Sequence, residues 1–290
     1  MERDLWKVIM AAIKALPPRS LRNSVYTNKQ ILAVIFWAAL HDRPISWASK
    51  RINWPVQAWR RRLPDQSTMS RRMRDPDLIE DINRIIEHIQ IPLPERRLLL
   101  TDGKAYAVTD RTNDPEAING WASGCFAKGY KLHVIIDEGH RLLRWRIESI
   151  NHGETTASSA ILSDLKPFDR KRILVGDAGY DSNPLHAAAR SGLRLIAPRH
   201  KPGTGLGNRR HHPNRLSSIG LTEGRGGWMW EMLRSRRNGV DRYFSGLVTS
   251  CVGAGHLPSW VRSVRRTRLW IGAKLAINAA RIVRNQQLHA

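Results

Sequence analysis

Residues 98–108 read LLLTDGKAYAV, an apolar run that is interrupted by one acid, Asp102. A short apolar run of this kind predicts a buried β-strand. Two further strands are predicted over 130–137 (YKLHVIID) and 142–150, and residues 138–140 (EGH) between them have the composition of a hairpin turn. This part of the chain therefore predicts a sheet that starts with antiparallel strands.

Helices and strands alternate in the next part of the chain. The sequence predicts a helix over 157–165, a strand over 172–175, a helix over 183–191 and a strand over 193–197. Antiparallel strands followed by alternating helices and strands imply a mixed α/β sheet with helices packed on it. A ribonuclease H-like fold needs this order of elements, and we expect residues 96–290 to form such a domain.

Residues 1–95 are predicted to form a separate, all-helical module. Thr27 and Gln30 have the spacing of a capping box in front of an apolar run, so a helix is expected to begin near residue 28. Asp65 or Ser67 is expected to cap a later helix, and such short helices are similar to a helix-turn-helix reader of DNA. The basic residues of that helix either contact DNA or form a solvated helix face, and they are Arg71, Arg72 and Arg74.

The charge of the chain is strongly positive and unevenly distributed. The formal net charge is +23, of which residues 1–98 contribute +8, residues 99–193 zero and residues 194–290 +15. A neutral core between two basic segments fits a protein that holds a polyanion such as double-stranded DNA. A basic protein of the ribosomal type is the alternative, but such proteins rarely contain a long, charge-balanced α/β segment.

Composition disfavours two other classes of protein. No stretch approaches the roughly 20 consecutive apolar residues of a membrane helix, and the amino terminus has no secretory cleavage pattern. We therefore expect a soluble, cytoplasmic, nucleoid-associated protein with no membrane partner. Only Cys125 and Cys251 are present, without CxxC spacing, which supports neither a disulfide framework nor a zinc site.

Three acids occur beside apolar runs, and they are Asp102, Asp177 in RILVGDAGYDS (172–182) and Asp241 in RRNGVDRYFSGL (236–247). If the fold brings them to one edge of the sheet, their carboxylates offer the oxygen ligands that hold Mg²⁺, or Mn²⁺ as its substitute, against phosphate oxygens. The apolar spacing around Asp241 is that of a helix, with Arg237 one turn earlier on the same margin. The alternative is that Asp241 only pairs with Arg237 or Arg242. The acids and the basic surroundings together suggest an enzyme that breaks or joins DNA strands.

Residues 199–227 lack periodicity and are rich in Gly, Pro, His and Arg, which predicts a flexible basic loop. Trp228 and Trp230 follow this loop directly. They are candidates for stacking on DNA bases, and core packing is the alternative role.

The motifs of the chain resemble those of the DDE transposases of bacterial insertion sequences, in the branch with a Tyr-Arg-Glu-Lys signature. LPDQSTMSRRMR (63–74) is similar to the amino-terminal signature of that family, TDGKAYAV (101–108) to its first acidic motif and KGYKLHVIID (128–137) to the strand beyond. VGDAGYDS (175–182) is the most specific match, because Gly179 and Tyr180 follow the acid in the expected pattern. The resemblance covers most of the chain. It implies a ribonuclease H-like catalytic domain and Mg²⁺-dependent cutting and joining of DNA at the inverted-repeat ends of the element.

By this resemblance Asp102, Asp177 and Asp241 are the catalytic and metal-binding triad, and Arg237 is the motif arginine. Arg237 and Arg242, beside the third acid, are further candidates for contact with DNA at the transposon ends and target. A homodimer in a synaptic complex is also implied.

Three positions depart from the family pattern. Asp241 stands where the family has Glu, Arg234 where it has Tyr and Val248 where it has Lys. Asp is one methylene shorter than Glu, so the helix must approach the metals more closely or water must bridge the gap. Two alternatives follow: a decayed transposase that still binds DNA, or a structure-selective DNA nuclease of the same fold. The acids that would replace a misplaced Asp241 are Asp110, Asp181, Glu223 and Glu231.

Overall fold

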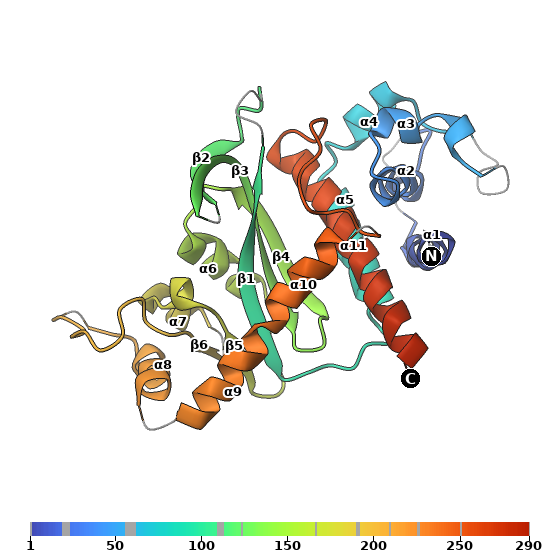
Figure 1. The fold of residues 1–290 in the computed structure, drawn as a ribbon. Coiled ribbons are helices and arrows are strands. Elements are labelled where there is room, and N and C mark those ends of the chain that lie inside the picture. Colours follow the sequence, from blue (N-terminus) through green and yellow to red (C-terminus); the bar gives the residue numbers. More distant parts are fainter. Residues whose placement is uncertain are drawn as a thin grey trace. The chain divides into compact units, whose positions relative to one another are not determined.

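The computed structural model of the 290-residue chain describes residues 2–18, 24–55, 62–108, 113–122, 124–165, 167–189, 192–208, 210–224, 227–249 and 251–289. Contacts within the chain divide it into two compact units, whose elements are labelled in Figure 1. The helical unit comprises Met1–Leu93 and Gly246–Ala290, and the sheet unit comprises Pro94–Ser245.

The helical unit is built around a long carboxyl-terminal helix. Its elements are α1 (Glu2–Ala15), α2 (Asn28–Leu40), α3 (Ile45–Ala48), the short 3-10 helix η1 (Arg51–Asn53), α4 (Gln66–Arg72), α5 (Asp77–Ile89) and α11 (Val264–His289). Helix α11 packs against α1, α2 and α5, and buries Leu275, Ala276 and Ile277 completely. No helix in the described residues is both long enough and apolar enough to cross a membrane.

The sequence placed residues 246–290 with the catalytic domain, and the structure differs here. These residues belong to the helical unit because the apolar side of α11 is covered by the amino-terminal helices. The capping box predicted at Thr27 is present: its hydroxyl accepts from the N–H of Gln30, and the Gln30 side chain accepts from the N–H of Thr27. Asp65, and not Ser67, caps α4.

In the described residues of the sheet unit, six strands form one mixed sheet. The strands are β1 (Leu98–Ala107), β2 (Ile118–Ala122), β3 (Cys125–Asp137), β4 (Leu142–Ser149), β5 (Arg172–Val175) and β6 (Leu193–Ile196). Their order is β2-β3-β1-β5-β6, with β4 also paired to β3. Strand β3 is antiparallel to β1, β2 and β4, whereas β5 is parallel to β1 and β6 is parallel to β5. This is the ribonuclease H-like arrangement that the order of elements predicted.

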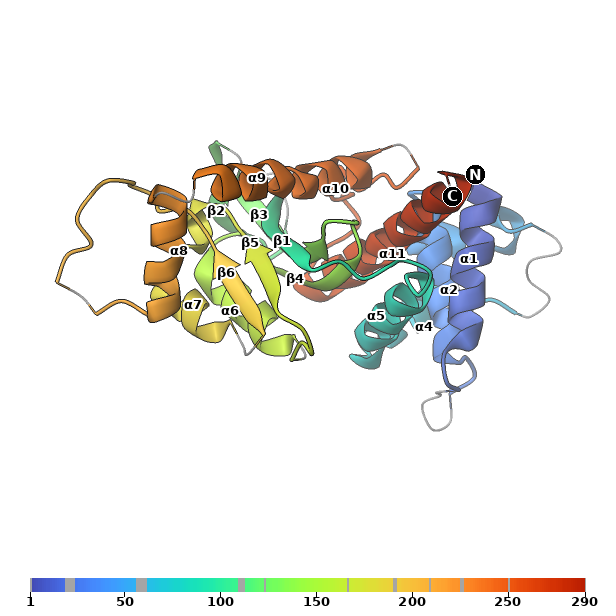
Figure 2. The same ribbon diagram turned by 90° about the horizontal axis from the view of Figure 1, so that it is seen from below.

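Helices cover both faces of the sheet. The helices of this unit are α6 (Glu154–Asp164), the 3-10 helix η2 (Ala178–Tyr180), α7 (Asn183–Ala188), α8 (Pro213–Glu223) and α9 (Gly227–Arg237). Helix α10 (Gly239–Val248) starts in the sheet unit, and its last three residues belong to the helical unit. Figure 2 shows α6 and α7 on one face of the sheet and α9 on the opposite face. A core cluster that includes Leu99, Ile161, Tyr180 and Leu185 fills the space between the sheet and α6 and α7.

Two sequence-based predictions in this unit were incomplete. Strand β2 was not predicted, because its sequence INGWA contains Asn and Gly and shows no apolar run. Residues 199–227 were predicted as a loop throughout, but 213–223 form α8. This helix starts at Pro213, which is favourable in the first turn, and Ser218 fixes it to the sheet by accepting from and donating to the backbone of Ala197.

Candidate functional site

Asp102 lies on the face of β1 that α9 and α10 cover. Side chains alternate between the two faces of a strand, and Leu99 packs into the core beneath α6 and α7. Leu100 points the other way: its Cδ1 atom would lie 2.9 Å from a Cβ atom added at Gly239, at the start of α10. Asp102 is two residues beyond Leu100 and shares its face. The strand period therefore directs this carboxylate towards α9 and α10.

Asp177 follows β5 directly, and the motif around it explains its orientation. Its Oδ1 atom accepts from the N–H of Gly179 at 2.9 Å, which caps η2. The ring of Tyr180 folds back over Gly176, where any added Cβ atom would lie 2.7 Å from it. Tyr180 is 2% exposed and part of the core cluster. Gly179 and Tyr180 thus support the site structurally, because they fix the turn that presents Asp177.

The strand register places the first two acids side by side. Strands β1 and β5 are parallel, and each paired residue of β5 lies 75 positions after its partner, as in Leu98 with Ile173 and Leu100 with Val175. Asp177 is also 75 positions after Asp102. Each acid therefore lies two residues beyond the last pair of this register, at the same end of the paired segment.

Arg237, at the end of α9, joins all three acids. Its Nη2 atom donates to Oδ2 of Asp102 at 2.8 Å and lies 3.9 Å from Oδ2 of Asp177. The separation of these two oxygens therefore cannot exceed the sum of those distances. The Nη1 atom lies 4.0 Å from Oδ2 of Asp241, one helical turn further on in α10. The structure brings the three sequence-predicted acids together around one guanidinium.

The three acids differ in exposure. The side chain of Asp102 is 17% exposed, that of Asp177 42% and that of Asp241 59%. Burial raises the pKa of the Asp102 carboxyl to about 6, the Arg237 guanidinium opposes this rise, and the nearby charges of Asp177 and Asp241 add to it. The pairing of Asp241 with Arg237, which the sequence left as an alternative role, is present together with its proximity to the other acids.

In its present arrangement the cluster is not a preformed metal cage. Among the described residues, no three Asp, Glu, His or Cys side chains lie close enough to hold one ion. The guanidinium of Arg237 instead provides the positive charge between the acids. The sequence predicted Arg237 as a neighbour of Asp241, but its contact with Asp102 is a long-range product of the fold that no local spacing reveals.

The predicted DNA-contacting residues fall into two groups. Arg71 on α4, Arg74 just beyond the end of α4 and Arg242 on α10 are exposed, whereas Arg72 is only 8% exposed. The guanidinium of Arg72 donates to Ser24, Tyr26 and Asn28. Arg72 therefore corrects the prediction: it ties α4 to the segment before α2 and does not present its charge to DNA.

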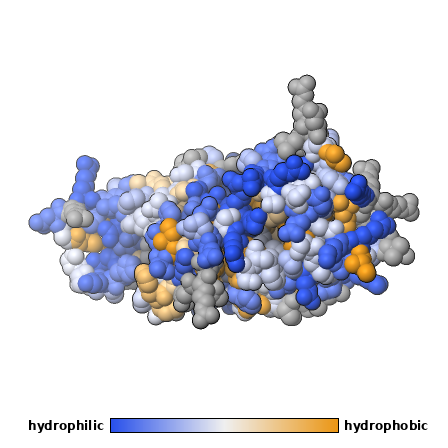
Figure 3. Space-filling model, turned by 90° about the horizontal axis from the view of Figure 1, so that it is seen from above, coloured by the Kyte–Doolittle hydropathy of each residue, from blue (hydrophilic) through white to orange (hydrophobic). Residues whose placement is uncertain are grey.

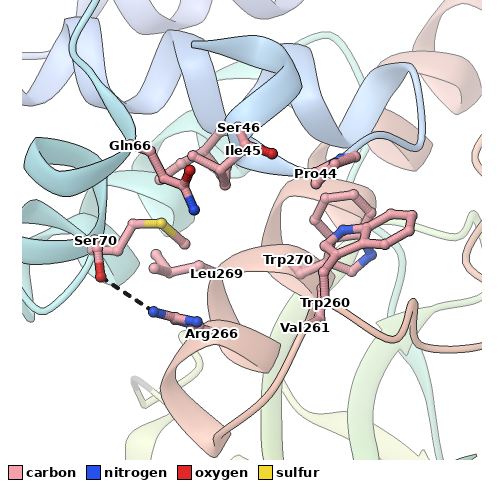
Figure 4. Close-up of a pocket in the computed structure, with 12 residues that line it drawn as sticks. Pro44, Ile45, Ser46, Gln66, Ser70, Trp260, Val261, Arg266, Leu269 and Trp270 are labelled. Atoms are coloured by element: carbon pink, nitrogen blue, oxygen red, sulfur yellow. Dashed lines mark hydrogen bonds between the residues drawn. The ribbon is translucent and has the colours of Figure 1, made fainter.

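The tryptophans also differ in their roles. Trp228 is 72% exposed at the start of α9, and Trp230 is partly buried. The helical unit contains a cavity of about 180 Å³, and Figure 4 shows Trp260 and Trp270 on one side of it. Trp270 is 4% exposed and meets Trp260 edge to face, which is a core-packing role. On the other side of the cavity Arg266 donates to Ser70 at 3.3 Å.

Of the four acids that would replace a misplaced Asp241, the three that the structure describes lie beside other cationic side chains. Asp181 forms a two-point ion pair with Arg215, at 2.8 Å and 2.7 Å, and lies 3.8 Å from the ring of His186. Burial alone would raise the pKa of Asp181, but the hydrogen bonds from Arg215 and the nearby ring of His186 lower it to about 2. Glu223 pairs with Arg199. The remaining two are Glu231, which is exposed and 3.9 Å from Arg234, and Asp110, which lies outside the described residues.

Comparison with known proteins supports one family. The model of the family described as "Transposase DDE domain" matches residues 93–243, which is more than half of the chain and includes all three acids. No curated protein and no solved structure matches. The chain belongs to the transposase DDE domain family.

Proposed function

We propose that this protein is a DNA transposase that cuts and joins strands at the ends of an insertion sequence by two-metal-ion phosphoryl transfer. A transposase DDE domain acts in the cutting and joining of DNA, and such domains generally use divalent metal ions. The single observation that carries the proposal is the gathering of Asp102, Asp177 and Asp241 around one cation. Three acids that are distant in sequence repel one another because their charges are alike, and they lie together here with the Arg237 cation between them.

The donor chemistry of the cluster fits Mg²⁺. Its three side chains offer carboxylate oxygens, which hard divalent cations prefer, and they already accommodate the positive charge of a guanidinium. Asp102, Asp177 and Asp241 would hold the ions, and Mn²⁺ would substitute for Mg²⁺. When bound, such ions neutralise charge on the phosphate and activate the attacking group.

Arg237 links the acids to the DNA. Its guanidinium occupies carboxylate oxygens that a metal ion would need. If Asp102 and Asp177 held a metal ion, Arg237 would have to release them, and its charge would be available for a DNA phosphate. Arg242 is exposed one residue after Asp241 and would extend this contact.

The substrate would be double-stranded DNA at the element ends and at the target. Cutting two ends in one event favours a homodimer in a synaptic complex, and the nucleoid in the cytoplasm is where such a protein would meet its substrate. Figure 3 shows a largely hydrophilic face with scattered apolar groups, which suits a polyanionic partner.

The test is metal-dependent nicking of DNA that carries the element ends. We expect nicking with Mg²⁺ or Mn²⁺, and a loss of at least about 100-fold in Asp102→Asn and Asp177→Asn, since each removes a ligand of the metal site. Asp169→Asn is the matched control, because Asp169 is an exposed acid of the same unit and lies outside the cluster. Metal-dependent nicking that persists in both Asn variants would refute the assignment.

A decayed transposase that binds DNA without cutting it is the second candidate. The observation that favours it is Asp241, which is the most exposed of the three acids and stands 4.0 Å from Arg237. Asp241→Glu discriminates between the two functions. If the wild type does not nick and the Glu variant does, the chain is a decayed enzyme.

A further inference from the structure

A basic groove lies in the sheet unit, where strands β1, β5 and β6 begin. It has a volume of about 720 Å³ and opens to solvent. Its cationic side chains come from four elements or their flanks, and they are Arg97, Lys171, Arg172, Arg194 and Arg236. Among the described residues that line it, Glu138 is the one acid. An opening of this size with five cations and one acid attracts an anionic ligand.

Three of the five cations are available to a ligand. Arg172 is engaged with Glu95 at 2.6 Å, and Arg236 with Glu138 at 2.6 Å. Within the described residues, Arg97, Lys171 and Arg194 form no ion pair, and all three are exposed. In the described part of the chain, the Arg194 guanidinium forms one hydrogen bond, to the hydroxyl of Ser217. Charges left unpaired on one surface repel each other, and an anion that binds among them relieves this repulsion.

The groove and the acid cluster share one face of the sheet. Leu98 and Ile173 line the groove, and they are paired in the register of β1 with β5. Asp102 and Asp177 follow them by four residues each. A strand rises about 3.3 Å per residue, so the groove lies roughly 13 Å from Asp102 along β1. Helix α9 contributes Arg236 to the groove and Arg237 to the acids.

We propose that this groove binds the phosphate backbone of duplex DNA. At about 3.4 Å per base pair, the spacing from groove to acids corresponds to roughly four base pairs. The groove would therefore hold the duplex about four base pairs from the phosphate at the acid cluster. Its exposed side chains are long and flexible, and the described residues that line it include no aromatic ring, so it contacts phosphates and does not read bases. This inference rests on the proposed function for the identity of the DNA, but the basic groove exists independently of catalysis.

The experiment measures duplex affinity without divalent ions. The groove variant combines Arg97→Gln, Lys171→Gln and Arg194→Gln, all at exposed positions. We expect this variant to fold as the wild type does, and an equal thermal unfolding midpoint verifies it. The control variant removes three exposed basic residues of the same unit that lie outside the groove, namely Lys201→Gln, Arg210→Gln and Arg234→Gln. The probe is a labelled duplex of random sequence, titrated at several salt concentrations in EDTA.

Loss of three phosphate contacts should weaken binding by roughly 10²- to 10³-fold at about 0.1 M salt and reduce the slope of log affinity against log salt by about 3. The control variant should lose much less affinity. Equal losses in both variants would attribute the effect to net charge, and unchanged binding in the groove variant would show that DNA lies elsewhere; either result overturns the inference. The two proposals can be refuted independently. If the wild type does not nick DNA, the measured role of the groove in DNA binding is unaffected. If the groove variant binds DNA normally, the effect of Asp102→Asn on nicking is unaffected.

Discussion

Replacement of Asp102 by Asn should stabilise the protein while abolishing its activity. Burial raises the pKa of the Asp102 carboxyl to about 6, whereas an unfolded Asp has a pKa of about 3.9. The fold therefore favours the protonated form. The resulting contribution to stability is fully present below about pH 4 and is lost as the pH rises through about 6.

The difference between the two pKa values gives the expected magnitude. Two pH units correspond to about 3 kcal/mol at roughly 1.4 kcal/mol per unit, and the side chain is sufficiently buried, at 17% exposed, for this conversion. Asn resembles the protonated acid and keeps an oxygen that accepts from Arg237. We expect Asp102→Asn to raise the free energy of unfolding at about pH 7 by up to about 3 kcal/mol, and by nearly zero at about pH 4.

The assay is denaturant unfolding of both proteins in EDTA across this pH range, with Asp169→Asn as the control. The free energy of unfolding of Asp102→Asn minus that of the wild type should grow as the pH rises through about 6, and the control should show no such trend. Two results would refute the inference that the charge of the Asp102 carboxylate is buried: a lower free energy of unfolding for Asp102→Asn at neutral pH, or an increase that does not depend on pH. A site that is stabilised by loss of its own charge is organised to bind a cation.

Further predictions concern the parts that support the site. Asp181→Asn should lower the free energy of unfolding at neutral pH by about 2 kcal/mol or more, because the low pKa of Asp181, about 2, reflects its pairing with Arg215. The stability that this pair contributes is present above about pH 4 and falls as the pH approaches 2. Denaturant unfolding of both proteins between these pH values would measure it. Gly176→Ala should weaken Mn²⁺ binding, since its Cβ atom would lie 2.7 Å from the ring of Tyr180; titration against the wild type checks this, and an unchanged affinity would contradict it. Thr27→Ala should lower the free energy of unfolding of the helical unit by about 1 kcal/mol through loss of its cap, and Thr27→Ser should recover it.

Much of the sheet unit was predictable because its signals are local. Strand β5 occupies the predicted residues 172–175, and β1, β3, β4 and β6 overlap their predicted ranges. Apolar runs and a hairpin turn are properties of neighbouring residues. The exposed strand β2 and helix α8 were missed because their stability depends on what they pack against.

The candidate site was predictable in composition but not in arrangement. Sequence motifs identified the acids, and the equal offset of 75 residues between strands and between acids became meaningful only with the register. The side-chain contact of Arg237 with Asp102 joins residues 135 positions apart. Arg72 shows the opposite case: an arginine on a basic helix has no local signal that distinguishes buried hydrogen bonding from contact with DNA.

The placement of α11 in the helical unit also needed tertiary information. An apolar helix can cover any apolar surface, and its sequence does not say which one. The burial of Lys274, 3.3 Å from Asp42, is one consequence that sequence periodicity does not predict.

The most direct test of the central claim is titration of the protein with Mn²⁺, followed by electron paramagnetic resonance, in the wild type and in Asp102→Asn, Asp177→Asn and Asp241→Asn. If the three acids form one metal site, the wild type binds Mn²⁺ and each variant binds it at least about tenfold more weakly, because each loses one carboxylate ligand. Asp169→Asn should bind as the wild type does. Wild-type Mn²⁺ affinity in all three Asn variants would contradict the account, because the acids would then be neighbours that share Arg237 and no metal.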